Sequence, residues 1–363
     1  MSRVAIDVAP IRPSPTGVGT YVRRLVKALH AEDAERFPLI GARAGGSFDA
    51  HAAVASAFRS RHYHAWLQRH AAADSRRAGA DLVHYTNAAA PLRAGLPYVL
   101  TIHDLSVLRH PGFHPLLRVA TLPLTFAAVL GARALIVPSN ATKAELARLF
   151  RVRRSRIHVV PHGRDAERPA PDPQERQRVL DRLGLEEGHF ILTTGTLEPR
   201  KNHARLIAAF SMLAAEDAGL RLVIAGAPGW GSGEVLRAIR ASRFAQRIAV
   251  TGYLPEREVD IVTAACGAFV YVSLYEGFGL PIVEAMAVGA PVVTSGRSAM
   301  PEAAGGAAVL VDPFSPSSIA EGIRRAVRGA DQLRQAGCIW SAQRPWSAVG
   351  RETLRVYEQA LST

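Results

Sequence analysis

Short apolar runs alternate with amphipathic helical stretches along the second half of the chain. Residues 203–214, for example, have helical periodicity and follow an apolar run and a polar loop. The runs expected to form strands are residues 190–194, 221–225, 248–251, 268–272, 291–294 and 308–311. Strands that alternate with helices in this way predict a parallel, doubly wound α/β sheet.

The first half shows a similar alternation. Its expected strands are residues 4–8, 81–86, 98–104, 134–138 and 157–163. A Pro/Gly loop at 10–19 separates the first strand from a helix at 20–30, and residues 105–123 are expected to form an irregular lid with several basic side chains. Ser139 is expected to cap a helix that begins at Asn140.

A polar, Pro-rich segment follows Asp165 and is typical of a linker or a lid. We therefore expect one domain at residues 1–165 and a second at 166–345. The remaining residues, 346–363, are expected to form an amphipathic C-terminal helix. The length of 363 residues agrees with about two domains.

The net charge of +13 is confined to the first half of the chain. Residues 1–165 hold 23 Lys and Arg against 10 Asp and Glu, whereas residues 166–363 hold 21 of each. This asymmetry indicates an anionic partner for the first domain, such as nucleic acid, an anionic membrane surface or a lipid pyrophosphate. A generally Arg-rich composition would explain the total charge but not its distribution.

Residues 51–79 are predicted to be helical and combine five arginines with interleaved aromatic residues. Such a segment can lie on a membrane interface or line an acceptor groove, or it can be a solvated helix with its aromatic side chains in the core. It contains no helix-turn-helix, zinc-finger or RNP-like pattern that would favour nucleic acid.

Several features indicate a reduced, cytosolic protein. The chain has two cysteines, Cys266 and Cys338, which are too few for a disulfide framework. The first ten residues enter a strand directly, without the apolar core of a signal peptide. The longest apolar stretch, 122–137, is interrupted by Gly131 and Arg133, so a membrane-spanning helix is not expected.

A strand, a glycine loop and a helix follow one another around Gly195, where the sequence reads GTLEPRKN. Arg200 and Lys201 stand just before the expected helix, and Asn202 is expected to cap it. Two cations beside the positive end of a helix dipole form a site for two phosphates. A solvated basic turn is the alternative interpretation of the same residues.

A second strand–turn–helix unit contains Glu276, a Gly-Phe-Gly turn and Pro281, which is favoured in a first helical turn. Glu284 follows about one turn into that helix. A carboxylate can accept two hydrogen bonds from a vicinal diol, so Glu284 suits a ribose. Taken as a pair, Glu276 and Glu284 could equally be solvated glutamates around a helix N-terminus.

The segment from Glu276 to Ser295 resembles the E-x7-E signature of retaining glycosyltransferases of the GT-B fold, glycosyltransferase family 4; it reads EGFGLPIVEAMAVGAPVVTS. The resemblance covers essentially the whole chain. It implies two Rossmann-like doubly wound domains that face each other across a cleft, with the last helix crossing back to the first domain. The chain departs from the family pattern at Ala348, where an acidic residue is usual.

The resemblance also implies roles for individual residues. The catalytic residues are expected to be His103, Arg200, Lys201 and Glu276. The residues expected to bind the sugar nucleotide are Gly17, Gly19, Gly195, Tyr253, Leu254, Gly277, Phe278, Gly279, Leu280 and Glu284. The acceptor is expected to contact Asp104, Arg109 and Asn140. The resemblance further implies that Arg200 and Lys201 stabilise the charge of the leaving group without a metal or other cofactor, which agrees with the lack of a His, Cys and Asp cluster with metal-ligand spacing.

The activity implied by the resemblance is hexosyl transfer with retention of anomeric configuration. Mannose or rhamnose from a GDP-sugar is the expected donor, and a lipid-linked saccharide of bacterial O-antigen, lipopolysaccharide or exopolysaccharide synthesis is the expected acceptor. The protein would then be cytoplasmic and peripheral on the inner face of the cell membrane. A sugar-nucleotide epimerase or a phosphorylase of the same architecture stays open, as does a basic nucleic-acid-binding protein.

Overall fold

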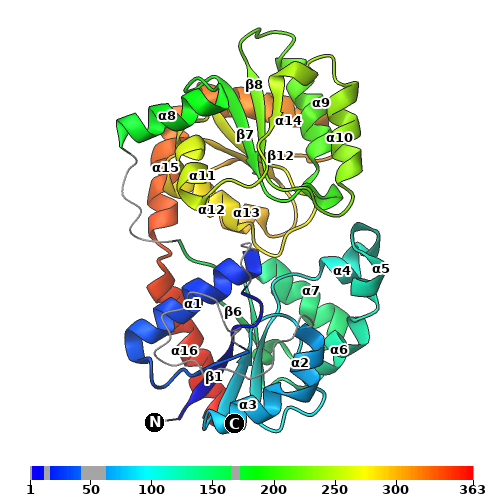
Figure 1. Cartoon of the computed structure of the whole chain (residues 1–363), viewed down its shortest axis with the longest axis vertical. Coiled ribbons are helices and arrows are strands. Elements are labelled where there is room, and N and C mark those ends of the chain that lie inside the picture. The colour runs from blue at the N-terminus through cyan, green and yellow to red at the C-terminus, as the bar shows by residue number, and fades with distance from the viewer. Residues whose placement is uncertain (1, 12–16, 42–62, 165–171, 363) are drawn as a thin grey trace. The chain divides into compact units, whose positions relative to one another are not determined.

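The computed structural model describes residues 2–11, 17–41, 63–164 and 172–362, and the chain divides into two compact units. Unit 1 comprises Met1–Arg109, Leu116–Gly163 and Pro345–Thr363, and unit 2 comprises His110–Pro115 and Arg164–Arg344. Each unit is an α/β layer structure with helices on both faces of one sheet (Figure 1). The predicted doubly wound α/β fold is therefore confirmed for both halves.

The sheet of unit 1 has six parallel strands in the order β2-β1-β3-β4-β5-β6. The strands are β1 (Val4–Asp7), β2 (Leu39–Ile40), β3 (Leu82–Tyr85), β4 (Tyr98–Thr101), β5 (Ala134–Val137) and β6 (Ile157–Val159). The sequence pattern did not predict β2, because two residues are too short to show a strand period.

Side chains of β1 alternate between two cores, as expected for a strand that is covered on both faces. Val4 and Ile6 pack in the core that contains α1 and α16, whereas Ala5 packs in the core on the opposite face. The helices of unit 1 are α1 (Gly17–Asp33), α2 (Tyr63–Arg69), α3 (Ala71–Arg77), α4 (Ser106–Arg109), α5 (Leu116–Val119), α6 (Leu122–Gly131), α7 (Asn140–Phe150) and α16 (Trp346–Ser362), with a 3-10 turn at η2 (Arg154–Arg156).

The C-terminal helix α16 is anchored to the sheet of unit 1 by a buried polar contact as well as by apolar packing. The hydroxyl of Tyr357 lies 2.7 Å from Nδ1 of His84 on β3, and Nε2 of His84 lies 2.7 Å from Oγ1 of Thr101 on β4. Arg133 adds a hydrogen bond of 2.9 Å to the carbonyl of Ala360 near the helix end.

Unit 2 repeats the architecture, with six parallel strands in the order β12-β11-β10-β7-β8-β9. The strands are β7 (Phe190–Thr194), β8 (Arg221–Ala225), β9 (Ile248–Val250), β10 (Ala268–Tyr271), β11 (Val292–Ser295) and β12 (Val309–Val311). Each lies within one residue of its predicted bounds. Strands β8 and β9 follow on one side of β7, and the chain then crosses to the other side for β10, β11 and β12, so loops from both halves of the sheet meet near its middle.

The helices of unit 2 cover both faces of this sheet (Figure 1). Its helical segments are η1 (Pro111–Phe113), α8 (Pro173–Leu183), η3 (Pro199–Lys201), α9 (His203–Leu213), α10 (Ser232–Ala241), η4 (Ala245–Arg247), α11 (Glu256–Ala265), α12 (Leu280–Ala287), α13 (Met300–Ala304), α14 (Pro316–Arg328) and α15 (Ala330–Ala342). One core lies under α9, α10 and α14, and the other lies under α8, α11, α12 and α13.

Two predicted segments differ in the structure. Residues 105–123 are not an irregular lid, because they hold α4, η1, α5 and the start of α6. Local capping explains the first of these helices, since Oδ1 of Asp104 accepts hydrogen bonds from the backbone N and the Oγ of Ser106. Helix α1 begins at Gly17 rather than at Thr20, so Gly17 and Gly19 are helical rather than part of a loop.

The predicted basic helix at residues 51–79 is described only in part, because residues 51–62, including Arg59 and Arg61, lie outside the described residues. The remainder forms α2 and α3. Trp66 is buried, and its indole N–H donates to Asp74 at 2.9 Å. These aromatic contacts favour the interpretation of a solvated helix with aromatic side chains in the core.

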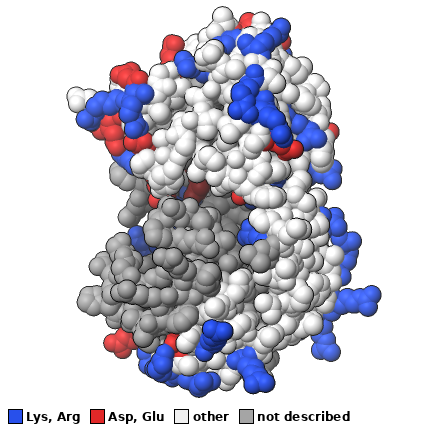
Figure 2. Space-filling view, turned by 45° about the vertical axis from the view of Figure 1, so that its right-hand side comes forward, with Lys and Arg blue, Asp and Glu red and all other residues white. Residues whose placement is uncertain are grey.

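Charged side chains are scattered over both units on the face shown in Figure 2. None of the helices that the structure describes combines the length and the apolar character that crossing a bilayer requires.

Candidate functional site

Two loops of unit 2 leave the carboxyl ends of neighbouring strands and are tied together by hydrogen bonds. The loop after β7 ends at Asn202, and the loop after β10 begins at Val272. The backbone N–H of Leu274 donates to the carbonyl of Arg200 at 2.9 Å, and the amide of Asn202 donates to the carbonyl of Val272 at 3.0 Å. The parallel pairing of β7 with β10 brings the two motifs of the sequence together.

The carboxylate of Glu276 lies between the two cations of the first motif. Oε2 is 2.5 Å from Nη1 of Arg200, and Oε1 is 2.7 Å from Nζ of Lys201. The side chains of Arg200, Lys201 and Glu276 are 13%, 12% and 10% exposed. Arg200 also donates to the carbonyl of Tyr275 at 2.9 Å, and Glu198 lies 3.7 Å from its other terminal nitrogen.

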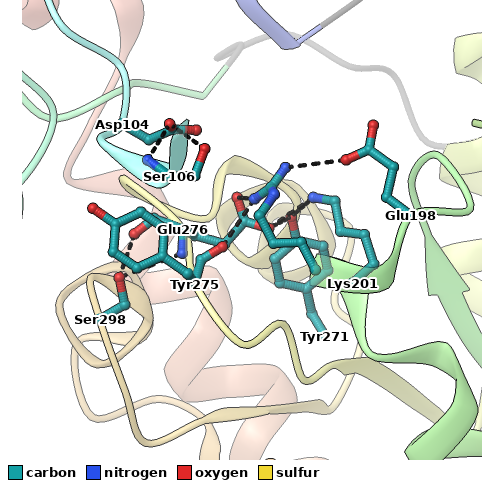
Figure 3. Close-up of polar contacts among 9 residues, drawn as sticks. Asp104, Ser106, Glu198, Lys201, Tyr271, Tyr275, Glu276 and Ser298 are labelled. Carbon is teal, nitrogen blue, oxygen red and sulfur yellow. Dashed lines mark hydrogen bonds and ion pairs between the residues drawn. The ribbon is translucent and has the colours of Figure 1, made fainter. Parts of the chain in front are cut away.

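Tyr271, the last residue of β10, completes this cluster, and the sequence analysis missed it. Figure 3 shows Lys201 and Tyr271 directed toward Glu276. Lys201 donates to the phenol oxygen, which in turn donates to Oε1 of Glu276 at 2.9 Å. An aromatic residue at the end of an apolar strand was the available signal, but it is common in cores and says nothing about polar partners.

Burial and the neighbouring opposite charges act in opposite directions on the pKa values of Glu276 and Lys201. Burial by itself would raise the pKa of Glu276, but Arg200 and Lys201 outweigh burial and lower that pKa from 4.5 to about 2. Burial lowers the pKa of Lys201, and Glu276 opposes that change. Burial and the neighbouring carboxylate both raise the pKa of Tyr271, so the phenol keeps its proton.

Backbone geometry holds the two loops in place. Gly195 has a φ of +120°, which L side chains rarely adopt, and a Cβ there would stand 3.5 Å from Cε of Lys201. Gly226 approaches so closely that a Cβ would lie 1.9 Å from the carbonyl oxygen of Gly195. Oγ of Ser298 donates to the carbonyl of Glu276 at 2.6 Å and accepts from its N–H at 3.3 Å, so the loop after β11 supports the carboxylate.

Asn202 occupies the N-cap position of α9 but does not cap the helix with its side chain, contrary to the prediction. Its Nδ2 donates to the carbonyls of Val272 at 3.0 Å and Pro313 at 2.7 Å, and its Oδ1 accepts from Arg205 at 3.0 Å. The side chain joins loops instead, because its Oδ1, the atom that would accept from a backbone N–H of the helix, accepts from Arg205, while its amide donates to two carbonyls.

The glycine turn after Glu276 leads into α12, as predicted. Gly279 is the N-cap with a φ of +108°, and Pro281 lies in the first turn. The ring of Phe278 is buried in the core, so the side chain of this residue serves packing. Leu280 and Glu284 are half-buried on α12.

The residues expected beside the base follow β9. Tyr253 is 60% exposed, whereas Leu254 is 9% exposed and packs in the core of unit 2. Because β9 is parallel to β7, this loop leaves the carboxyl end of the sheet, as does the loop after β7 that carries Arg200 and Lys201. His110 also belongs to unit 2, where its ring centroid lies 5.4 Å from that of Tyr275.

The predicted catalytic residue of unit 1, His103, lies just beyond the carboxyl end of β4 and is half-buried against other rings. Its Nε2 lies 2.9 Å from the carbonyl of Thr86, which can only accept, so Nε2 carries the proton of the neutral ring. Burial lowers the pKa of His103. Its ring centroid lies 4.7 Å from that of Tyr21 and 5.7 Å from that of His162.

The other predicted residues of unit 1 have local partners or helical positions. Asp104 binds Ser106, as described above (Figure 3). Arg109 forms an ion pair of 3.2 Å with Glu145, and Asn140 is the exposed first residue of α7. A Cβ on Gly17 would meet no atom within 4 Å.

The predicted cap of α7 is confirmed, since Oγ of Ser139 accepts from the N–H of Thr142 at 3.1 Å. Within the described parts of both units, no three His, Cys, Asp or Glu side chains are grouped to hold a metal ion.

Comparison with known proteins defines the class to which this fold and site belong. Residues 176–337 match the family described as "Glycosyl transferases group 1", and residues 15–168 match "Glycosyltransferase Family 4". The O-antigen chain mannosyltransferase B of Escherichia coli is 30% identical over 266 residues, which are 72% of this chain and 70% of that protein.

Solved structures show the same GT-B fold. The Anabaena protein Alr3699/HepE, in complex with UDP and glucose, matches with a TM-score of 0.76 at 18% identity and covers 99% of this chain and 100% of its own. WaaG, described as a glycosyltransferase involved in lipopolysaccharide biosynthesis, matches with a TM-score of 0.73 at 17% identity, covering 97% and 99%.

The protein is thus a glycosyltransferase of the GT-B fold. The chain belongs to glycosyltransferase family 4, which confirms the resemblance seen in the sequence and favours transfer over epimerisation, phosphorolysis or nucleic-acid binding.

Proposed function

We propose that this enzyme transfers mannose or rhamnose from a GDP-sugar to a lipid-linked saccharide of bacterial surface polysaccharide synthesis, with retention of anomeric configuration. The observation that carries the donor site is the pair of nearly buried cations, Arg200 and Lys201, beside Glu276 at the carboxyl end of the sheet. The name of the O-antigen mannosyltransferase relative supports the sugar and the acceptor class. The UDP complex of the Anabaena protein supports a nucleoside diphosphate as the carrier.

Arg200 and Lys201 suit the diphosphate because charge develops on the leaving phosphate as the bond to the sugar breaks. Cations fixed in a nearly dry site stabilise that charge without reorganisation, and they can do so without a divalent metal. We assign the ribose hydroxyls to Glu284, and the sugar hydroxyls to Glu276 and the turn at Gly277–Gly279.

In the reaction that we propose, the acceptor oxygen forms a bond to C1 of the sugar while the bond from C1 to the phosphate oxygen breaks. The departing phosphate takes the acceptor proton on the same face, so the configuration is retained. We propose that His103, Gly17 and Gly19 contact the reacting sugar or the acceptor, and that Asp104, Arg109 and Asn140 contact the acceptor.

We further propose that unit 1 carries the enzyme to an anionic membrane surface. The excess of basic residues in the first half of the chain supports this, as do exposed apolar side chains of α5 and α6, including Leu116 at 86% and Leu130 at 59% exposure. Binding to phosphatidylglycerol vesicles that weakens in high salt is expected. Equal binding to neutral vesicles would contradict the electrostatic part.

Calorimetric titration of GDP, UDP, ADP and dTDP with EDTA present tests the donor site. One diphosphate is expected to bind at micromolar concentration to the wild type, and its binding is expected to be lost in Glu284→Ala and Lys201→Ala. Glu216→Ala is the matched control, because Glu216 lies past the far end of α9 and pairs with Arg324. Unchanged binding in both site variants would refute the residue assignment, and selective binding of UDP would refute the GDP-sugar.

Glycosyl transfer with the donor that binds tests the remaining steps. Nuclear magnetic resonance of the anomeric proton of the product is expected to show the configuration of the donor. An inverted product would refute the proposed same-face attack.

A further inference from the structure

The two cations assigned to the donor diphosphate already share an internal counter-ion. One oxygen of Glu276 contacts Arg200, and the other contacts Lys201, at 2.5 Å and 2.7 Å. A diphosphate that binds both cations must compete with this carboxylate, since each contact is a charge-assisted hydrogen bond in a nearly buried site.

Glu276 is held in this position through both its side chain and its backbone. The phenol of Tyr271 bridges Lys201 and Glu276, and the carbonyl of Tyr271 accepts a hydrogen bond of 2.8 Å from Thr294 on β11. The backbone of Glu276 is held by the two hydrogen bonds to Ser298. Because neighbouring strands and loops fix both residues, the contact is built into the framework of unit 2.

We propose that Glu276, positioned by Tyr271, is a selectivity latch: its carboxylate occupies Arg200 and Lys201, and it is displaced more readily by a ligand that offers both a diphosphate and sugar hydroxyls than by one that offers a diphosphate alone. The proposal rests on the proposed function, because it takes the two cations as the diphosphate site. It assigns Tyr271 a positioning role that the motif residues do not include.

The physical basis is the cost of leaving a buried carboxylate without its two cationic partners. Inorganic pyrophosphate or a free nucleoside diphosphate displaces Glu276 from its cations and gives it no new donor. A sugar nucleotide displaces it in the same way, but its hydroxyls can donate to the freed oxygens. The latch therefore disfavours free anions and, once the sugar has left, favours release of the nucleoside diphosphate.

Titration of inorganic pyrophosphate with EDTA present tests the latch in the full-length protein. Glu276→Gln keeps the shape of the side chain and removes its charge. We expect it to bind pyrophosphate at least about tenfold more tightly than the wild type, which corresponds to about 1.4 kcal/mol. Glu216→Gln removes one carboxylate from an exposed ion pair of the same unit and is expected to leave pyrophosphate binding unchanged.

A second comparison uses the nucleotide that binds in the donor test and its sugar derivative. The preference of the wild type for the sugar nucleotide over the free diphosphate is expected to fall about tenfold or more in Glu276→Gln. Thermal unfolding checks that the variant folds, and pyrophosphate is expected to raise its midpoint more than that of the wild type.

Equal or weaker pyrophosphate binding by Glu276→Gln would overturn the latch while leaving the diphosphate site intact. If neither pyrophosphate nor any nucleotide binds to any form, the proposed diphosphate site fails, and the latch fails with it.

Tyr271→Phe gives an independent test, because it keeps the ring and removes only the bridging hydroxyl. It is expected to shift the preference in the same direction as Glu276→Gln but by less, since the contact between Lys201 and Glu276 persists. In steady-state assays the inhibition constant for the nucleoside diphosphate is expected to fall more than KM for the sugar nucleotide. An unchanged ratio of these constants would remove Tyr271 from the proposal.

Discussion

The buried carboxylate of Glu276 predicts a pH-dependent contribution to stability. Glu276→Gln replaces it with a side chain that resembles the protonated acid. In the folded protein its pKa lies at about 2 rather than at 4.5, because Arg200 and Lys201 outweigh the effect of burial. At ~1.36 kcal/mol per pKa unit, the ionised form stabilises the folded state by about 3 kcal/mol at pH 7.

The sign follows from the direction of the change. A carboxylate whose folded pKa is lowered contributes its stability in full above its ordinary pKa and loses it as the pH falls through the folded value. The difference in free energy of unfolding between wild type and Glu276→Gln is therefore expected to shrink from about 3 kcal/mol at pH 7 to about 1.4 kcal/mol at pH 3.

Urea unfolding followed by circular dichroism at pH 7, 5, 4 and 3 measures this difference. Glu216→Gln serves as the control, since Glu216 is 62% exposed in its ion pair and should contribute little at any pH. A difference between wild type and Glu276→Gln that stays constant from pH 7 to pH 3 would refute the reasoning. A variant as stable as the wild type at pH 7 would do so as well.

Three further predictions concern the framework of the fold and the site. Asn202→Ala loses buried hydrogen bonds to two backbone carbonyls, so urea unfolding should show a loss of about 2–3 kcal/mol; a loss below ~0.5 kcal/mol would contradict this. Gly226→Ala places a Cβ on the carbonyl of Gly195, so calorimetry should show nucleotide binding weakened at least about tenfold, and unchanged affinity would show that the loop adapts. Tyr357→Phe leaves Nδ1 of His84 without its buried partner, and unfolding should show a cost of about 1–2 kcal/mol; no change would mean that the contact with His84 does not help to hold α16.

The strands of unit 2 could be predicted closely because each is a short apolar run bounded by loops, which the alternation of the sequence displays directly. The failures have local causes. Strand β2 is too short to show a period, and α4, the first helix after Asp104, begins at a contact between Asp104 and Ser106 that composition does not reveal. The prediction that Asn202 would cap α9 failed because its Oδ1 accepts from Arg205 rather than from a backbone N–H of the helix, while its amide donates to carbonyls distant in the sequence.

In the candidate site, too, some residues could be predicted from sequence motifs and others could not. Arg200, Lys201 and Glu276 stand out in the sequence because they belong to strand–glycine–helix motifs. Tyr271 and Ser298 do not, since one ends an apolar strand and the other lies in a loop after β11. Their positions beside Glu276 follow from the pairing of β10 with β7 and β11.

The sequence by itself determined the α/β architecture, the family and the residue types of the proposed donor site, because periodicity and motif spacing are local properties of the chain. The tertiary structure decided which of those residues touch. Lys201 and Glu276 are 75 residues apart, and only the order of parallel strands places the ammonium against the carboxylate. Burial then increases the free-energy cost of losing that contact, because a charge removed from water is stabilised mainly by the partner that the fold supplies.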